Sequence, residues 1–176
     1  GGGLLLAIDQ QIPSKRRADL ETHCEIMVCE IKSKQNPKLA IILCYRPPDS
    51  DRIAFNHYLE DVLFNVVKEF SHICMLGDFN LPEIDWVNPD HLSTPNGEFV
   101  NLMLSYALSQ INVVPSNAHS HLLDLIFSNS NELVIGVNRV DCSFPSDHNV
   151  LSFDINVHVK QKAVFKRTIY NYKRAD

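Results

Sequence analysis

The sequence has no run of about 18 consecutive apolar residues, the length at which a helix can cross a bilayer. No basic stretch precedes the apolar segment 4–8, so the pattern of a secretory signal is missing as well. The chain also does not begin with methionine: it opens with three glycines, and we expect it to be a fragment whose start lies upstream. We expect no membrane partner.

The cysteines do not form a recognisable metal or disulfide pattern. They are five, an odd number, and no two have the C-x-x-C spacing. Four lie in or beside apolar runs rich in β-branched residues: Cys24, Cys29, Cys44 and Cys74. The fifth is Cys142. This pattern favours buried free thiols in a reducing compartment over disulfides or a zinc site.

Several other catalytic and binding patterns are missing. The opening glycines lack the Lys-Ser/Thr of a nucleotide-binding phosphate loop. His119 and His121 stand two residues apart, but no third ligand has a spacing typical of zinc sites. No serine or cysteine nucleophile with an accompanying base is apparent.

Positive charge is not in excess. Lysine and arginine number 16 against 21 aspartates and glutamates, a net charge of −5, which is unfavourable for binding nucleic acid. The charge is uneven, because residues 160–176 carry +5 and residues 1–159 carry −10. Such an acidic body repels phosphate unless some acids hold cations or the basic groups cluster on one face. We predict a domain over residues 1–159 and a basic linker over 160–176 toward a downstream domain.

Hydrophobic patterning predicts a layered α/β domain with a mixed sheet. Strands are expected at 4–8, 24–32, 39–45, 73–76, 122–128, 133–140 and 149–159. A helix should follow the cap-type residues 49–51, because apolar side chains then recur in steps of three and four up to Phe70. A second helix is expected after Asn96 and Gly97. The hairpin-like stretches 24–45 and 122–159 argue against a simple doubly wound sheet.

The strongest local signal is the segment 75–82, which reads Met-Leu-Gly-Asp-Phe-Asn-Leu-Pro. A short apolar strand should end at Gly77, and Asp78 and Asn80 would then project to the same side. The carboxylate could bind or deprotonate water, and the amide NH₂ could donate to a negative oxygen. The alternative is an Asx-turn in which both side chains only satisfy nearby backbone groups.

A second signal combines Asp147 and His148, at the start of the last strand, with Asp124 inside an earlier apolar strand. An acid in such a strand is costly to bury unless it is paired. If Asp124 faces His148, it would fix the tautomer of the imidazole and stabilise the imidazolium. The alternatives are a surface or packing histidine and an acid on a solvated face of the sheet.

Together these residues predict metal-assisted hydrolysis of a phosphodiester by direct attack of water. Carboxylates and amides are hard oxygen ligands that suit Mg²⁺ or Mn²⁺. A His–Asp pair with a further carboxylate can align water and stabilise the added negative charge. Tyr45, at the end of another strand, could hold a phosphate oxygen or could simply flank the turn. The predicted site consists of Tyr45, Asp78, Asn80, Asp124, Asp147 and His148.

The segments 76–80, 123–127 and 146–148, in this order, resemble the motifs of the endonuclease/exonuclease/phosphatase superfamily. The segments 45–48 and 78–86 more closely resemble the apurinic/apyrimidinic-type endonuclease domain of non-long-terminal-repeat (LINE-type) retrotransposon polyproteins. Residues 1–7 resemble a segment inside that domain. Residues 170–173 resemble the connector toward the reverse transcriptase.

The resemblance implies a DNase I-like fold, a four-layer αββα sandwich with its site at one edge where the two sheets meet. It implies Mg²⁺-dependent nicking of DNA, which primes reverse transcription at the target. The implied partners are DNA and a downstream reverse transcriptase domain. The implied location is intracellular, in the nucleus at the point of action.

The resemblance also implies roles for single residues. Asp78 would orient or deprotonate the attacking water, and Asn80 would position the water and the phosphate. His148 would contact the scissile phosphate with Asp124 as its partner. Asp147 would contribute to the metal site, together with Asp78, or to protonation of the leaving group. The remaining residue of the set, the tyrosine at position 45, would hold the phosphate.

One departure from the family pattern concerns a metal-binding glutamate and an early asparagine, for which this sequence has no counterpart. Glu21, Glu25 and Glu30 lack the matching context. We therefore expect the fold to lack its N-terminal strand and helix, which would leave an uncovered sheet edge, and expect this chain to nick little DNA. The alternatives are a degenerate non-catalytic remnant or binding domain, and a phosphodiesterase or phosphatase of the same superfamily acting on another phosphate ester.

Overall fold

Helices and strands are interspersed in the computed structural model, which describes residues 3–32, 38–86, 93–115, 121–141, 146 and 148–158. In chain order the elements are β1 (Ser14–Arg16), the 3-10 helix η1 (Ala18–Leu20), β2 (Ile26–Ile31), β3 (Leu39–Tyr45), α1 (Arg52–Glu69), β4 (His72–Asp78), α2 (Thr94–Ser105), β5 (Ser109–Gln110), β6 (Asp124–Ser128), β7 (Val134–Val140) and β8 (Val150–Ile155).

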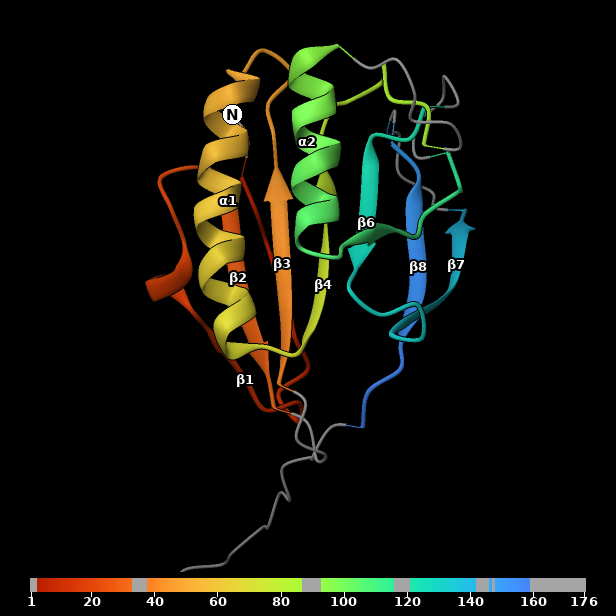
Figure 1. Cartoon of the computed structure of the whole chain (residues 1–176). Helices are drawn as coiled ribbons and strands as arrows, with labels where there is room; N and C mark the ends of the chain where they lie inside the picture. Colours follow the sequence, from red (N-terminus) through yellow and green to blue (C-terminus); the bar gives the residue numbers. More distant parts are fainter. Residues whose placement is uncertain are drawn as a thin grey trace, which may run out of the picture.

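Most strands belong to one mixed sheet of order β1-β2-β3-β4-β6-β5 (Figure 1). Strands β3 and β4 are parallel and joined through α1, because a parallel pair needs a crossover connection. The other neighbouring pairs of this sheet are antiparallel. Strands β7 and β8 form a separate antiparallel sheet.

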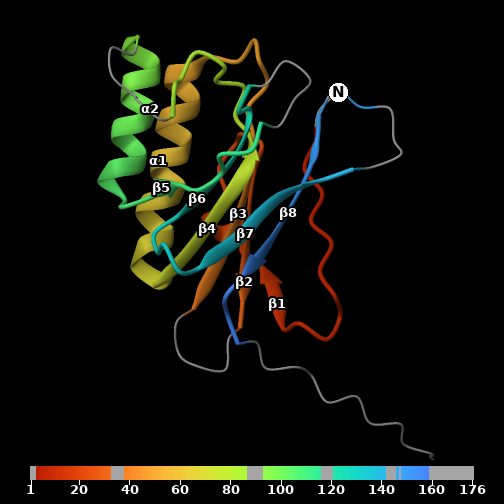
Figure 2. The same cartoon turned by 90° about the vertical axis from the view of Figure 1, so that its right-hand side faces the viewer.

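Both α-helices lie on one face of the six-stranded sheet, and the β7–β8 sheet lies on the other (Figure 2). Each central strand is therefore covered on both sides. On β3, Ala40 and Ile42 belong to the core under the helices, while Leu39 and Ile41 belong to the core between the sheets. This double burial explains why β3 is apolar along most of its length, without polar alternation.

Helix α1 begins where Asp51 accepts hydrogen bonds from the backbone N–H groups of Ile53 and Ala54, at 2.9 and 3.1 Å. Its apolar stripe packs on the sheet, as the spacing predicts. Two apolar residues with the helical spacing, Tyr58 and Val67, lie at the margin of this stripe and are 40% and 41% exposed.

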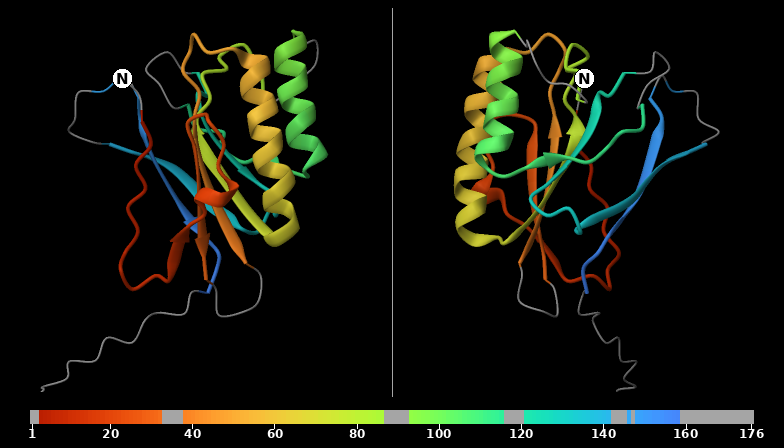
Figure 3. Two further views of the ribbon diagram at one scale, coloured as in Figure 1. Left: turned by 90° about the vertical axis from the view of Figure 1, so that its left-hand side faces the viewer. Right: turned by 45° about the vertical axis from the view of Figure 1, so that its right-hand side comes forward.

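Strand β8 has one exposed and one partly buried face: its even-numbered residues are exposed, and Phe153 and Ile155 turn toward the six-stranded sheet. The N-terminal segment runs beside β8 before it reaches β1 (Figure 3). Its Leu6 and Ile8 line an apolar cavity of about 420 Å³ between the sheets, together with Phe153 and Ile155 of β8.

Four details of the predicted organisation are wrong. Residues 4–8 are not a strand, although their side chains alternate between partly buried and exposed. Helix α2 begins before Asn96 and Gly97, because Pro95 occupies its first turn, where the missing N–H costs nothing. The stretch 122–159 is not one hairpin unit, since β6 joins the large sheet. Strand β4 continues through Gly77 to Asp78.

Other predictions agree with the structure. The α/β class and the mixed sheet are confirmed, and the described residues form three of the four predicted layers. Cys24, Cys29, Cys44 and Cys74 are free thiols, the last three of them buried. Cys142 and the predicted linker 160–176 lie outside the described residues. Within the described part of the chain, no helix has the length and apolar character required to span a membrane.

Candidate active site

Three predicted site residues lie in one row across the six-stranded sheet. Tyr45 of β3 is in register with Asp78 of β4, and Asp78 is in register with Asp124 of β6. Residues paired in this way point to the same face, and directly opposed antiparallel residues have Cβ atoms about 5 Å apart. The face is the one that meets the β7–β8 sheet, because Leu76 and Ile126, two residues away, pack between the sheets.

The strands that carry this row approach each other closely at Gly77. A Cβ atom at this position would lie 1.8 Å from the backbone oxygen of Cys44, and the backbone φ of Gly77 is +151°. Only glycine tolerates this contact. Gly77 therefore does not end the strand, and its lack of a side chain lets β3 and β4 come together just before Asp78.

Asp78 and Asn80 are held against each other by a tight turn. The backbone N–H of Asn80 donates to Oδ1 of Asp78 at 3.1 Å, and its side-chain Nδ2 donates to Oδ2 at 3.0 Å. The first bond is that of the Asx-turn alternative, so the turn exists and also brings the two side chains together. Asn80 adopts φ +48°, a left-handed conformation that asparagine tolerates better than most residues.

The orientation of the Asn80 amide follows from its partners. Nδ2 donates to Oδ2 of Asp78 and also to the backbone oxygen of Arg46, at 2.9 Å. Both partners are acceptors, so the NH₂ group must point toward them and both its protons are used inside the protein. Asn80 therefore offers its Oδ1 oxygen, rather than the expected NH₂, to a water molecule or a cation.

Asp124 and His148 form a dyad that joins the two sheets. Oδ2 of Asp124 lies 2.8 Å from Nδ1 of His148, and the side chains are 28% and 35% exposed. His148 stands just before β8, where its backbone N–H donates to Oγ of Ser146 at 3.1 Å. An acid on Nδ1 keeps a proton on that nitrogen, so Nε2 is an acceptor in the neutral imidazole and a second donor in the imidazolium. The predicted pairing is thus present in the structure.

The negative charges of Asp78 and Asp124 repel each other across the neighbouring strands β4 and β6. Burial raises the pKa of the Asp78 carboxyl above its ordinary value, and the neighbouring Asp124 carboxylate raises it further. The hydrogen bonds from Asn80 and the charge of His148 act in the opposite direction. A proton or a cation beside Asp78 would relieve this repulsion.

Two supporting residues were not identified from the sequence. Asn112 is fully buried, and its Nδ2 donates to the backbone oxygen of Asp124 at 2.9 Å. Arg46 is 1% exposed and contacts the Asp78–Asn80 turn. The available signal was a polar residue between apolar ones, Asn112 between Ile111 and Val113.

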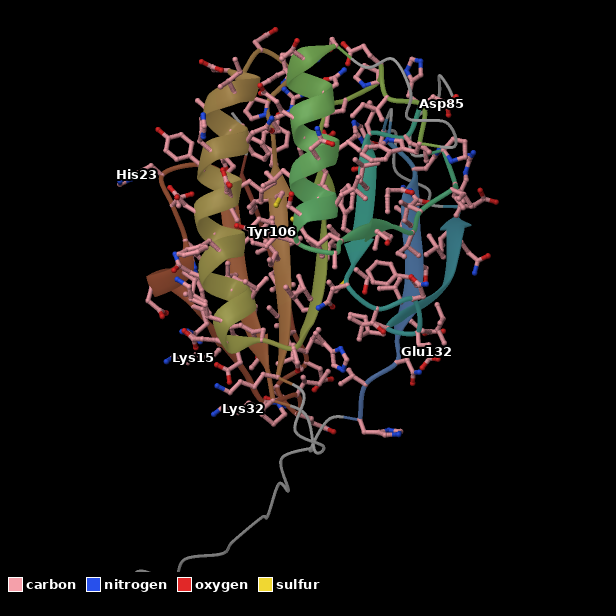
Figure 4. The ribbon with its side chains drawn as sticks, in the orientation of Figure 1. Lys15, His23, Lys32, Asp85, Tyr106 and Glu132 are labelled. Atoms are coloured by element: carbon pink, nitrogen blue, oxygen red, sulfur yellow. The ribbon has the colours of Figure 1, made fainter. Side chains whose placement is uncertain are left out.

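The segments 78–86 and 146–148, which carry the resemblance, contain the further residues Asp85, Trp86 and Asp147. Asp147 lies outside the described residues, as does His119. Trp86 packs against Phe99 and Phe127, with centroid distances of 6.3 and 5.6 Å, so it is a core residue. Asp85 lies at the end of the sheets that carries the row, whereas Lys15 and Lys32 lie at the opposite end (Figure 4).

The fold is similar to that of solved nucleases and phosphatases. The endonuclease domain of TRAS1, a telomere-specific non-LTR retrotransposon, matches with a TM-score of 0.68 at 18% identity, covering 84% of this chain and 68% of that one. The 3′ phosphatase NExo from Neisseria, bound to product DNA hairpin, matches with a TM-score of 0.56 at 13% identity, covering 84% and 71%. The 3′-5′ exonuclease NExo from Neisseria meningitidis gives 0.55 at 14% identity, covering 83% and 71%. The DNase I-like fold class is confirmed.

One family model matches the amino-acid sequence of this chain and identifies its family. Curated protein sequences give no significant match to the chain. The family model described as endonuclease-reverse transcriptase matches residues 39–152, more than half of the chain, including Tyr45, Asp78, Asn80, Asp124 and His148. The chain therefore belongs to the endonuclease-reverse transcriptase family, within the superfamily of endonucleases, exonucleases and phosphatases that hydrolyse phosphate esters.

Proposed function

We propose that this chain is the DNA-nicking endonuclease domain of a retrotransposon polyprotein, with Mg²⁺ or Mn²⁺ as cofactor. The observation that carries the proposal is the Asp124–His148 dyad, which spans the two sheets beside Asp78 and Asn80. This places a carboxylate, an amide oxygen and an oriented imidazole on one edge, the groups that hydrolysis of a phosphodiester by water requires.

Each residue has a separate role in this proposal. Asp78, whose raised pKa makes it a better proton acceptor than an ordinary aspartate, deprotonates or orients the attacking water. Asn80 fixes the water through its Oδ1. His148, held by Asp124, contacts the scissile phosphate and stabilises its negative charge as an imidazolium. The hydroxyl of Tyr45 holds a phosphate oxygen.

The side chains fit a hard divalent cation, although they do not enclose one by themselves. No group of three or more His, Cys, Asp or Glu side chains within the described residues is placed to hold a metal ion. Mg²⁺ commonly keeps several waters and takes only one or two carboxylates from a protein. Asp78 and Asp147 would supply these ligands. The cation would polarise the phosphate and stabilise its developing charge.

The proposed partners follow the family. DNA is the substrate, and a reverse transcriptase domain lies downstream in the parent polyprotein, so the reaction takes place in the nucleus. The TRAS1 match and the DNA-bound NExo match support DNA over other phosphate esters. We further propose that these 176 residues alone nick slowly, because no glutamate in them has the context of the family's metal-binding glutamate.

The test is nicking of supercoiled plasmid with protein in excess, so that a slow single turnover is visible. We expect slow conversion to open circles with Mg²⁺ and none with EDTA. Asp78→Ala and His148→Ala should each abolish the reaction. Asp61→Ala and His57→Ala, two exposed positions on α1, are the matched controls and should nick as the wild type does.

Three outcomes would contradict the proposal. Nicking in EDTA, or nicking that survives both site substitutions, would exclude this edge as the active site. DNA binding without any nicking would favour the non-catalytic binding domain. Fast nicking that both substitutions abolish would support the site and refute the proposed low activity of this chain.

A further inference from the structure

Arg46 is a buried arginine that forms no ion pair with any carboxylate among the described residues. The residue is 1% exposed. Its Nη1 is buried and has no hydrogen-bond partner among the described residues. Burial lowers the pKa of the guanidinium, since the charged form loses hydration. Such a cation is costly to retain, so its remaining contacts indicate what it does.

All of these contacts reach one short segment. Nε of Arg46 donates to the backbone oxygen of Phe79 at 2.6 Å, and Nη2 donates to the backbone oxygen of Asn80. The backbone of Arg46 binds the same turn: its N–H donates to the oxygen of Asp78 at 2.9 Å, and its oxygen accepts from Nδ2 of Asn80 at 2.9 Å. One residue thus contacts three consecutive residues that include the proposed water-activating acid.

The turn requires such support. Asn80 has φ +48°, and a non-glycine residue in this conformation persists when its surroundings hold it there. The rotation of this backbone sets the direction of the Asn80 amide and hence of the Asp78 carboxylate that it contacts. The planar Arg46 guanidinium fixes the backbone conformation of the turn by donating to two of its carbonyl oxygens at once. A lysine ammonium lacks this planar pair of donors and cannot reproduce both contacts.

We propose that Arg46 is a positioning residue, which holds Asp78 and Asn80 in their catalytic arrangement through the carbonyl groups of Phe79 and Asn80. The inference rests on the proposed function for its effect on catalysis. Its effect on the turn can be measured without activity.

The test uses Arg46→Lys in the whole chain, with Arg52→Lys as the matched control. The Arg52 guanidinium contacts Glu83 and Asn96, both at 2.9 Å, and in the described part of the chain it donates no hydrogen bond to the Asp78–Asn80 turn. In Arg46→Lys we expect the NMR signals of the Asn80 side-chain amide to shift and its protons to exchange faster. Loss of an outer residue that orients a catalytic group typically reduces activity about 10–100-fold.

A double-mutant cycle separates positioning from a general structural role. We expect Arg46→Lys to lower the single-turnover nicking rate about 10–100-fold, with DNA affinity changed less than about twofold. In an Asn80→Ala background the same change should cost less than about threefold, because residues that act as a unit are not additive. Arg52→Lys should leave the amide signals and the rate unchanged.

The outcomes distinguish this inference from the proposed function. If the Asn80 side-chain amide protons exchange faster in Arg46→Lys but the wild-type chain does not nick DNA, the positioning role is upheld and the proposed function is refuted. A wild-type rate and unchanged amide signals in Arg46→Lys would overturn the positioning, as would full additivity with Asn80→Ala. If Arg46→Lys does not fold, Arg46→Gln is measured instead. Failure of both to fold would make Arg46 a residue of the core and overturn the inference.

Discussion

Replacement of Gly77 by alanine should destabilise the domain far more than loss of a glycine usually does. The new Cβ would lie 1.8 Å from the oxygen of Cys44 and 2.7 Å from its carbonyl carbon, where at least 3.0 Å is needed. Strands β3 and β4 must therefore separate by more than an ångström at the point where both are covered by other layers.

The magnitude follows from two contributions. Strain of a non-glycine residue at φ +151° costs about 1–3 kcal/mol. Separation of the strands also weakens one or two backbone hydrogen bonds, including that from Arg46 to the oxygen of Asp78, at about 1 kcal/mol each. We expect a total loss of about 2–5 kcal/mol, a large part of the 5–15 kcal/mol that stabilises a typical domain.

Urea unfolding followed by circular dichroism measures this loss. Gly136→Ala is the matched control, because Gly136 also has a positive φ, +65°, but its added Cβ would meet only Oδ2 of Asp154 at 3.7 Å. The control should lose about 1–2 kcal/mol. Equal losses in the two variants would refute the idea that close strand contact, rather than the backbone angle, makes Gly77 necessary.

Three further predictions concern the acids and their supports. The Asp78 carboxyl should titrate above its ordinary value of 3.8 in a ¹³C NMR titration, and Asp124→Asn should move it downward by removing a like charge. Since the pKa of Asp78 is raised in the folded state, its contribution to stability should be present below the unfolded pKa and lost as pH rises through the folded pKa. Asn112→Ala should cost about 2 kcal/mol in urea unfolding, because it removes the hydrogen bonds that the Asn112 amide donates to the backbone oxygen of Asp124 and accepts from the backbone N–H of Val114.

Each of these has an outcome that would contradict it. An unchanged Asp78 titration in Asp124→Asn would show that the two carboxylates do not interact. Stability that increases with pH across the Asp78 transition, relative to Asp78→Ala, would reverse the sign of its shift. A loss below about 0.5 kcal/mol in Asn112→Ala would indicate that water replaces the missing amide.

The central strands could be predicted well from the sequence because burial on both faces leaves an unmistakable apolar run. Strand β3 has the predicted bounds at both ends. The short strands β1 and β5 could not be found, since the three residues of β1 are all exposed and β5 has only two. Their pairing is decided by neighbours distant in sequence, not by their own composition.

The site was predicted in its members more than in its geometry. Asp78, Asn80, Asp124 and His148 stand out locally as polar residues at the ends of apolar strands, and the structure brings them together. The direction of the Asn80 amide could not be predicted, because it is set by the backbone oxygen of Arg46, 34 positions away. The Arg46 guanidinium contacts backbone carbonyl groups of Phe79 and Asn80, which no sequence pattern marks.

The Asp124–His148 contact connects two elements of unequal local stability. Asp124 belongs to a strand paired on both sides, whereas β8 is paired only with β7 among the described strands and exposes Val150 at 44%. A two-stranded ribbon is marginal without the layer that it covers, so β8 should open more often than β6 and exchange its amide hydrogens sooner. The intact dyad is then one state of an equilibrium, and the occupancy of that state would limit the rate of the proposed hydrolysis.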